Sequence, residues 1–145
     1  MSIIQWGVDF YTGLPDVDRQ HLKLVALANR LSEVADDQPE ALDQAFRELQ
    51  DYILEHFSLE ERLMEEAKID ADHLKYHKHA HALFVAKITE LWDARNRGSG
   101  QTLEEMLIFL TSWILQHILQ TDRRMAIEVH AKLGTSAPHN MFTHF

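Results

Sequence analysis

The sequence predicts an all-α fold, an antiparallel up-down-up-down four-helix bundle preceded by an extended arm. Apolar residues recur at alternating steps of three and four positions in four long stretches, which is the pattern of helices with one buried face. Short polar connections separate the stretches, and short connections favour antiparallel neighbours. The 145 residues suffice for one domain and not for two. We therefore expect a single domain over 1–145, with an arm over 1–15, four helices over about 16–133 and an irregular tail over 134–145.

The arm is expected to meet the first helix near residue 16. Gly13 and Pro15 are turn residues, and Asp16 or Asp18 could cap the first backbone N–H groups of a helix. Residues 36–39 end this helix, and Pro39 suits the first turn of the next one. The inward stripe of the first helix comprises Val17, His21, Leu24, Ala28, Leu31 and Ala35.

The second and third helices continue the pattern. A break at 68–72 separates them, and the third helix is expected over about 72–97. The stripe of the second helix comprises Leu42, Phe46, Leu49, Ile53, His56, Glu60 and Leu63. The stripe of the third helix comprises Leu74, His77, His81, Phe84, Ile88 and Leu91.

The fourth helix is expected after the loop at 98–100, where Thr102 and Glu105 form a capping-box pattern. Gly134 suits its end. The tail beyond it contains Pro138, and we expect it to be irregular and to pack across the bundle. The stripe of this helix comprises Leu103, Leu107, Leu110, Ile114, His117 and Thr121.

Composition and charge exclude several classes of protein. Hydrophobic residues make up 46% of the chain, as in globular proteins, and the formal net charge of −9 should repel the phosphates of nucleic acid. The sequence holds no cysteine, which rules out disulfides, thiolate zinc sites and cysteine-bound iron–sulfur clusters. The first residues lack the basic region of a secretory signal, and no apolar run is long enough to cross a bilayer. We therefore expect no nucleic-acid partner, no membrane association and a cytoplasmic location.

Seven side chains of metal-ligand type fall where the four helices point inward. Six lie on the predicted stripes, and burying so many ionisable groups is costly unless they pair or coordinate metal. One inward histidine alone is more simply a hydrogen-bonded core residue, but histidines on all four stripes are difficult to explain in that way. We therefore predict a metal centre in the middle of the bundle. The candidate ligands are His21, His56, Glu60, His77, His81, His117 and Asp122.

The residue types and spacings indicate the chemistry of this centre. His56 and Glu60 are four residues apart, as are His77 and His81, so each pair projects from one face of a helix. Imidazole suits iron, zinc and copper, and the added carboxylates favour iron or manganese. Five imidazoles and two bridging carboxylates supply nine bonds, whereas two six-coordinate ions need twelve. An oxo or hydroxo bridge adds two, which leaves one position open to a small molecule.

Asp122 does not fit an ideal helix. It follows His117 by five residues, which rotates it by about 140° around the axis of a regular α-helix. A local π-bulge, a feature often found at functional sites, would turn it toward the other ligands. We therefore expect a bulge here, or a side chain that turns inward from the edge of the stripe.

The other polar residues are expected to have no role in the metal centre. His73 also stands four residues before His77, but it falls one position before the stripe, and His79 lies on another face. Trp113 is expected to pack in the core. The histidines expected to be exposed near the C-terminus are His130, His139 and His144. The glutamates expected to form an exposed acidic face are Glu61, Glu65 and Glu66.

Several motifs occur in a specific order along the chain. They are Trp6, Thr12-Gly13, Asp18-Arg19-Gln20-His21, His56-Phe57-Ser58-Leu59-Glu60-Glu61, Leu63-Met64, His77, His81, Phe84, Trp113 and His117-Ile118-Leu119-Gln120-Thr121-Asp122. With these H-x-x-x-E, H-x-x-x-H and H-x-x-x-x-D units, the chain resembles the hemerythrins, and most closely the single-domain bacterial hemerythrins. The resemblance extends over most of the sequence, from about residue 6 to residue 125.

The resemblance implies a non-haem di-iron site that binds dioxygen reversibly. The implied ligands are His77, His81 and His117 on one iron, His21 and His56 on the other, and Glu60 and Asp122 as bridges, together with an oxo or hydroxo bridge. The two-histidine iron would keep the open position. Ile114 and Phe57 are candidates for the apolar wall of the oxygen pocket.

Three functions are compatible with such a site. The first is oxygen carriage, storage or delivery, without catalysis, and an oxygen-consuming protein would be the partner for delivery. The second is an oxygen or redox sensor that acts through a signalling partner, because hemerythrin-like domains also occur attached to signalling modules. The third is a di-iron enzyme, such as a peroxidase or a nitric oxide reductase. We favour the first, since an imidazole-rich site favours reversible binding, whereas di-iron oxygenases of ferritin-like bundles use mostly carboxylates.

Overall fold

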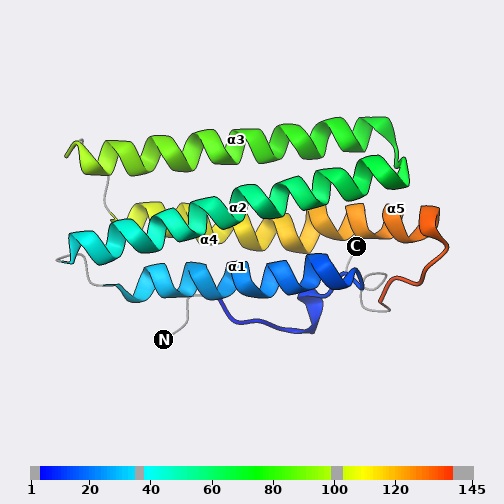
Figure 1. Cartoon of the computed structure of the whole chain (residues 1–145), viewed down its shortest axis with the longest axis horizontal. Helices are drawn as coiled ribbons and strands as arrows, with labels where there is room; N and C mark the ends of the chain where they lie inside the picture. Colours follow the sequence, from blue (N-terminus) through cyan, green and yellow to red (C-terminus); the bar gives the residue numbers. More distant parts are fainter. Residues whose placement is uncertain (1–3, 35–37, 99–102, 139–145) are drawn as a thin grey trace.

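Four apolar stripes joined by short turns fold into an antiparallel four-helix bundle. The computed structural model describes residues 4–34, 38–98 and 103–138. Three rods of the bundle are α1 (Pro15–Glu33), α2 (Pro39–Ala67) and α3 (Ala71–Asn96). The fourth rod is built end to end from α4 (Leu103–Gln116), η2 (His117–Asp122) and α5 (Arg123–Leu133), and Figure 1 shows the rods lying side by side. The all-α, four-helix architecture predicted from the sequence is confirmed.

Proline occupies the first turn of two of the helices. Pro15 begins α1 and Pro39 begins α2, where the missing backbone N–H leaves no hydrogen bond unmade. The expectation that Asp16 or Asp18 caps the first helix is wrong, because α1 begins before both residues and has no side-chain cap. The two carboxylates instead lie in the first turn, where negative charge is favourable.

Asp18 has a different task, which is to fold the arm against the start of α1. Its Oδ1 accepts hydrogen bonds from the backbone N–H and the hydroxyl of Thr12, both at 2.7 Å, and its Oδ2 accepts one from the N–H of Gly13 at 3.0 Å. Further along the arm, which includes the short helix η1 (Val8–Phe10), Ile4 exchanges two backbone hydrogen bonds of 2.9 Å with the Asn29 side chain. The arm therefore lies along α1.

The turn between α2 and α3 falls within the predicted break. Lys68 adopts the left-handed conformation with φ of 55° and ends α2. Asp70 caps α3, because its side chain accepts a hydrogen bond of 3.0 Å from the backbone N–H of His73. This tight turn sets α3 antiparallel to α2.

The inner face of α3 differs from the predicted stripe at both ends. His73 and Trp92 are buried, whereas Leu74 and Leu91 are only partly buried. The central stripe, which includes His77, is buried as expected. The prediction relied on apolar residues to extend the stripe, and a buried histidine at its start was therefore missed.

The fourth rod carries its inner face on Met106, Leu110 and Ile114, while Leu103 and Leu107 are partly buried. Gly134, with φ of 72°, ends α5 as predicted. Some expectations concern residues outside the described ranges, namely Ala35 on the first stripe, the sequence at 36–37, the loop at 99–100, the Thr102 cap and the histidines at 139 and 144. Within the described ranges, no helix is both long and apolar enough to cross a membrane.

Among the described residues, the buried hydrophobic side chains form two clusters. The large cluster is centred on buried residues that include Leu24, Leu49, Ile53, Phe84, Leu110 and Ile118. The small cluster comprises Leu14, Val17, Met64, Ala67, Ile69, Met125, Ala126 and Val129. Along α1, Val17 belongs to the small cluster and Leu24 to the large one, so that His21 lies between them. On α2 the large cluster (Ile53) comes before His56 and Glu60 and the small one (Met64) after them, and on the fourth rod Ile114 and Met125 flank His117 and Asp122 in the same way. A polar layer therefore divides the core.

The tail packs against the arm at a glycine. Gly13 has φ of 78°, and a Cβ at this position would lie 2.8 Å from Cδ of Pro138 and 3.0 Å from Nε2 of His130. Ala137 packs against the small cluster. The described part of the tail therefore packs at the end of the bundle where α1 begins.

We predict that Gly13→Ala lowers the free energy of unfolding more than Gly134→Ala does. Both alanines are forced into the left-handed region, at a cost of about 1–2 kcal/mol. Only the first also meets neighbouring atoms, which adds about 1–3 kcal/mol, whereas nothing lies within 4 Å at Gly134. Urea unfolding followed by circular dichroism would measure both. Equal losses would show that the tail does not pack on Gly13 in solution.

Candidate metal centre

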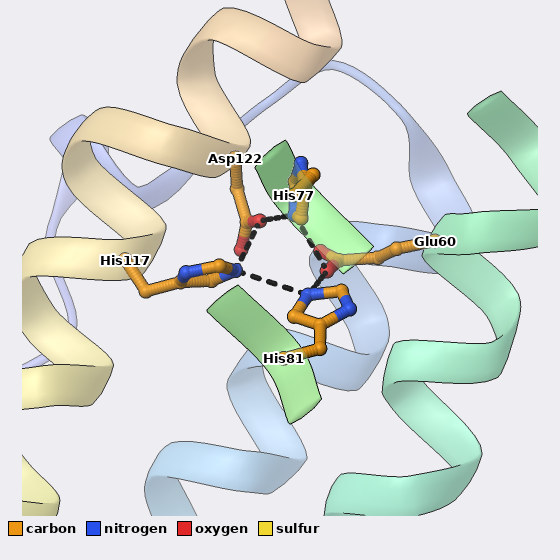
Figure 2. A group of neighbouring side chains, drawn as sticks. All are labelled: Glu60, His77, His81, His117 and Asp122. Carbon is orange, nitrogen blue, oxygen red and sulfur yellow. Dashed lines mark hydrogen bonds and ion pairs between the residues drawn. The ribbon is translucent and has the colours of Figure 1, made fainter. Parts of the chain in front are cut away.

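The polar layer is formed by the seven candidate ligands, and every one of them is buried. Their exposed fractions range from 0% to 5%. Figure 2 shows five of these side chains pointing toward one another from α2, α3 and η2. The remaining two come from α1 and α2. The structure thus brings together all seven residues singled out in the sequence.

Five of them form one compact group, which we name the three-histidine group. It comprises Glu60, His77, His81, His117 and Asp122. The Nε2 atoms of His81 and His117 are 3.1 Å apart, and Glu60 Oε1 is 3.1 Å from His81 Nε2. Asp122 Oδ1 lies 3.0 Å from both His77 Nε2 and His117 Nε2.

The second group, the two-histidine group, comprises His21, His56, Glu60 and Asp122. Glu60 Oε2 is 3.1 Å from His56 Nε2 and 3.3 Å from His21 Nε2. Asp122 Oδ2 is 2.9 Å from His21 Nε2. Each carboxylate therefore directs one oxygen into each group, which is the arrangement of an acid that bridges two cations.

The spacing of these atoms matches the edges of metal coordination polyhedra. Ligand atoms about 2.1 Å from an ion and about 90° apart are about 3.0 Å from each other. Glu60 Oε1, His77 Nε2 and both carboxylate oxygens of Asp122 are buried and make no hydrogen bond of ordinary geometry. These atoms lie close together but are not aligned for hydrogen bonds, which is the arrangement of ligand atoms around a shared ion. The donor set therefore fits metal.

Asp122 reaches the group because the fourth rod changes its winding. Residues His117–Asp122 form a π-helical segment, in which residues five apart lie nearly above one another. In a regular α-helix the same spacing would point Asp122 about 140° away from His117. The bulge expected from the sequence is therefore confirmed.

Comparison with known proteins agrees with this geometry. The family model described as the hemerythrin HHE cation binding domain matches residues 12–126. The chain belongs to the hemerythrin family. It is therefore a hemerythrin-like cation-binding domain with a buried cluster of histidine, glutamate and aspartate that is consistent with a di-iron site.

Relatives of this hemerythrin domain include bacteriohemerythrins and a hemerythrin-like protein. A bacteriohemerythrin of Stenotrophomonas maltophilia (strain R551-3) is 29% identical over 138 residues, covering 94% of this chain and 88% of that protein. A bacteriohemerythrin of Pseudomonas aeruginosa (strain LESB58) is 31% identical over 123 residues, covering 84% and 78%. A hemerythrin-like protein of Naegleria gruberi is 29% identical over 123 residues, covering 85% and 91%.

The fold of the hemerythrin bundle is matched by a solved structure. The crystal structure of a hemerythrin point mutant superposes with a TM-score of 0.78 at 23% sequence identity, covering 89% of this chain and 98% of that one. At this level of identity the match concerns the fold alone.

Three of the candidate ligand imidazoles have another side chain at the outer nitrogen of the ring. His56 Nδ1 is 2.9 Å from Gln20 Oε1, and His81 Nδ1 is 2.9 Å from Glu61 Oε2. In metal sites generally, a partner on the outer nitrogen of a ligating imidazole keeps the inner nitrogen facing the ion. Glu61 is thus more than part of an exposed acidic face, although its side chain is 30% exposed. Sequence reasoning missed this role, and its one signal was that Glu61 adjoins a ligand.

The third of these imidazoles is His77, and the side chain at its outer nitrogen is His73. His73 Nε2 lies 3.1 Å from His77 Nδ1, and His73 is only 4% exposed. The expectation that His73 lies outside the inner face is therefore wrong. The first turn of α3 brings it inward, because Asp70 fixes the backbone at this position. His79, in contrast, is exposed as expected.

His130 is a second histidine whose predicted exposure is wrong. It is 4% exposed, its Nε2 donates to the carbonyl of Thr12 at 2.9 Å, and its Nδ1 lies 2.6 Å from the hydroxyl of Thr135. The ring therefore joins α5 to the arm and the tail. Its hydrogen bonds are to Thr12 and Thr135, and none is to a candidate ligand.

Aromatic rings cover the three-histidine group. Phe57 stacks on His81 with ring centroids 3.7 Å apart, and Trp113 stacks on His117 at 4.3 Å. Trp113 also stacks on Phe84, so it packs as expected. Two surface hollows, of about 450 Å³ and 190 Å³, reach the outer sides of the His81 and His117 rings respectively. The ligand atoms are thus screened from water by stacked rings.

In the metal-free site, the histidines and carboxylates that face one another shift each other's pKa. Burial alone would lower the pKa of His21, but the carboxylates of Asp122 and Glu60, which face its ring nitrogen, raise it to about 10. The pKa of His77 rises to about 9 for the same reasons. Burial would raise the pKa of Glu60 and Asp122, but the facing histidines outweigh it and keep both well below the usual range. Any metal that binds must displace these protons.

We predict that the metal-free protein loses stability as the pH rises from 6.5 to 10. A pKa raised in the folded state contributes stability that is complete below the unfolded value of 6.5 and is lost through the folded values of about 9 and 10. The thermal midpoint in the presence of a chelator should fall by several degrees over this range. His21→Gln should flatten the fall, and His79→Gln should not. A midpoint that rises between pH 6.5 and pH 9 would contradict the charge arrangement.

Proposed function

We propose that this protein binds dioxygen reversibly at a pair of iron ions, for oxygen carriage, storage or delivery. In this proposal the three-histidine group holds one iron and the two-histidine group holds the other. Glu60 and Asp122 bridge the two ions, together with an oxo or hydroxo ligand. When bound, the iron pair would supply the electrons and the open coordination position that dioxygen requires.

The observation that carries the proposal is the division of each carboxylate between the two groups. Because Oε1 of Glu60 faces one group and Oε2 faces the other, two ions rather than one are accommodated. Five imidazoles among nine donor atoms favour iron over the purely oxygen-bound cations such as magnesium and calcium. The two-histidine group offers one protein ligand fewer, so we assign the open position to it.

The protein's own residues have two tasks in this function. They hold the ring nitrogens inward, through Gln20 and Glu61 on the outer side of His56 and His81. They also exclude water, because the layer lies between two hydrophobic clusters and beneath the rings of Phe57 and Trp113. Ile114, which is 1% exposed, is part of the large cluster and supports the apolar wall proposed for the pocket.

Reversible binding is proposed in preference to catalysis. The site has more imidazole than carboxylate ligands, unlike the carboxylate-rich di-iron centres with Glu-x-x-His units. The relatives from Stenotrophomonas and Pseudomonas are named bacteriohemerythrins, and we extend the oxygen-binding role of the family to this chain. A sensor acting through a signalling partner would use the same site, and its distinguishing property would be rapid autoxidation.

We predict two irons per chain after expression in iron-replete cells, with little zinc or copper. His77→Ala and His117→Ala each remove one ligand of the three-histidine group and should lower the iron content substantially. His79→Ala, an exposed position on the same helix as His77, is the matched control and should retain both irons. Elemental analysis of the purified proteins measures all four. One metal per chain, or zinc alone, would overturn the di-iron assignment.

We also predict that the anaerobically reduced protein gains colour on exposure to air and loses it on removal of oxygen, over repeated cycles. The visible spectrum measures this change, and stopped-flow mixing measures the rate of oxygen release. Fast release without oxidation of the iron supports carriage or delivery. A single irreversible colour change would contradict reversible binding and would favour a sensor or a redox enzyme.

A further inference from the structure

His73 is a buried titratable side chain that the proposed function does not use. It lies in the first turn of α3, where its backbone N–H donates to the Asp70 side chain at 3.0 Å. Its imidazole is 4% exposed and stands perpendicular to the His77 ring, with centroids 5.2 Å apart. A leucine of similar size would fill this space without the cost of burying a polar ring. The polar ring therefore calls for a reason beyond packing.

The contact with His77 determines where a proton lies. His77 Nε2 faces the acids of the site, 3.0 Å from Asp122 and 3.6 Å from Glu60. To bind a metal through Nε2, a neutral imidazole must carry its single proton on Nδ1. That Nδ1–H points to His73 Nε2 at 3.1 Å, so His73 must accept the hydrogen bond.

The group that faces Nδ1 of His73 determines which tautomer His73 adopts. If Nε2 accepts, the proton of His73 lies on Nδ1, which faces Glu128 Oε2 at 3.8 Å. Among the described residues this oxygen is buried without a hydrogen bond, and Arg124 Nε lies 3.9 Å from it. The distance exceeds a hydrogen bond, so the carboxylate acts on the Nδ1–H of His73 by electrostatic attraction. Glu128 thus favours the tautomer of His73 that can accept from His77.

We propose that His73 is a positioning residue for the metal centre, which holds His77 in the tautomer and orientation that present Nε2 to the metal. This inference rests on the proposed function, because it assumes that His77 is a ligand. Glu128 on α5 orients His73 in turn, so a chain of three side chains joins α5 to the ligand on α3. Gln20 and Glu61 occupy the same outer position behind His56 and His81.

The test compares His73→Leu, His73→Gln and the control His79→Leu. Leucine removes the acceptor, whereas the side-chain oxygen of glutamine can still accept from His77 and its amide can donate toward Glu128. Fe(II) affinity is measured anaerobically by competition with a chelator, after circular dichroism has shown that each variant is folded. We expect His73→Leu to bind Fe(II) about 10-fold more weakly, which is typical of the loss of a partner behind a ligand. His73→Gln and His79→Leu should stay near the parent.

A spectroscopic measurement separates positioning from packing. The N–H proton of His77, shifted by the bound iron, should move in His73→Leu and remain near the parental position in His73→Gln. Glu128→Ala changes no residue of α3, although it also removes the hydrogen bond between the Glu128 carboxylate and the Asp70 backbone. It should weaken Fe(II) binding in the same direction but by less, and it keeps the test valid if leucine prevents folding. Parental affinity in both His73→Leu and Glu128→Ala would overturn the proposal, as would equal losses in the leucine and glutamine variants.

The outcomes also separate this inference from the proposed function. If the parent protein binds no pair of irons, or binds them without reversible oxygenation, the proposed function fails. If the parent binds iron normally and the variants at His73 and Glu128 do so equally well, only the positioning role fails.

Discussion

Burial of seven ionisable side chains in one layer is the constraint on which the rest of the structure depends. Each would be unstable alone in an apolar core, so all must face one another or a shared cation. Their presence splits the hydrophobic interior into a large and a small cluster. Every rod therefore has to place its polar residues at the same level, and the relative heights of the helices are set by the layer as well as by apolar packing.

The two groups of ligands connect the helices unequally. Glu60 on α2 and Asp122 on η2 belong to both groups, whereas α1 contributes only to the two-histidine group and α3 only to the three-histidine group. α2 and the fourth rod therefore contribute side chains to both groups, whereas α1 and α3 each contribute to one of them. A change in either shared acid affects both groups, whereas a change in His21 or His81 affects one.

Periodicity and residue type sufficed to predict the four helices and the side chains of the site, because one stripe on each helix held nearly all the inward histidines. Even the unusual winding before Asp122 could be inferred, since its spacing from His117 conflicts with 3.6 residues per turn. The partners behind the ligands could not be predicted in this way. Contacts of Glu61, His73 and His130 depend on which neighbouring element each side chain meets, and a stripe carries no such information.

The π-helical segment links the ligand set to the packing of everything that follows it. It inserts what is in effect one additional residue into the fourth rod, and both Asp122 and the apolar face of α5 depend on that insertion. Loss of a single codon within 118–121 would restore ordinary winding, because the rod would then lack the additional residue. The acid would follow His117 by four residues, as Glu60 follows His56, and Met125 and Val129 would keep their side of the rod. In genetic terms this is the one stretch of the fourth rod where a one-codon deletion preserves the inner face, whereas the same deletion in α4 or α5 would turn every later residue by about 100°.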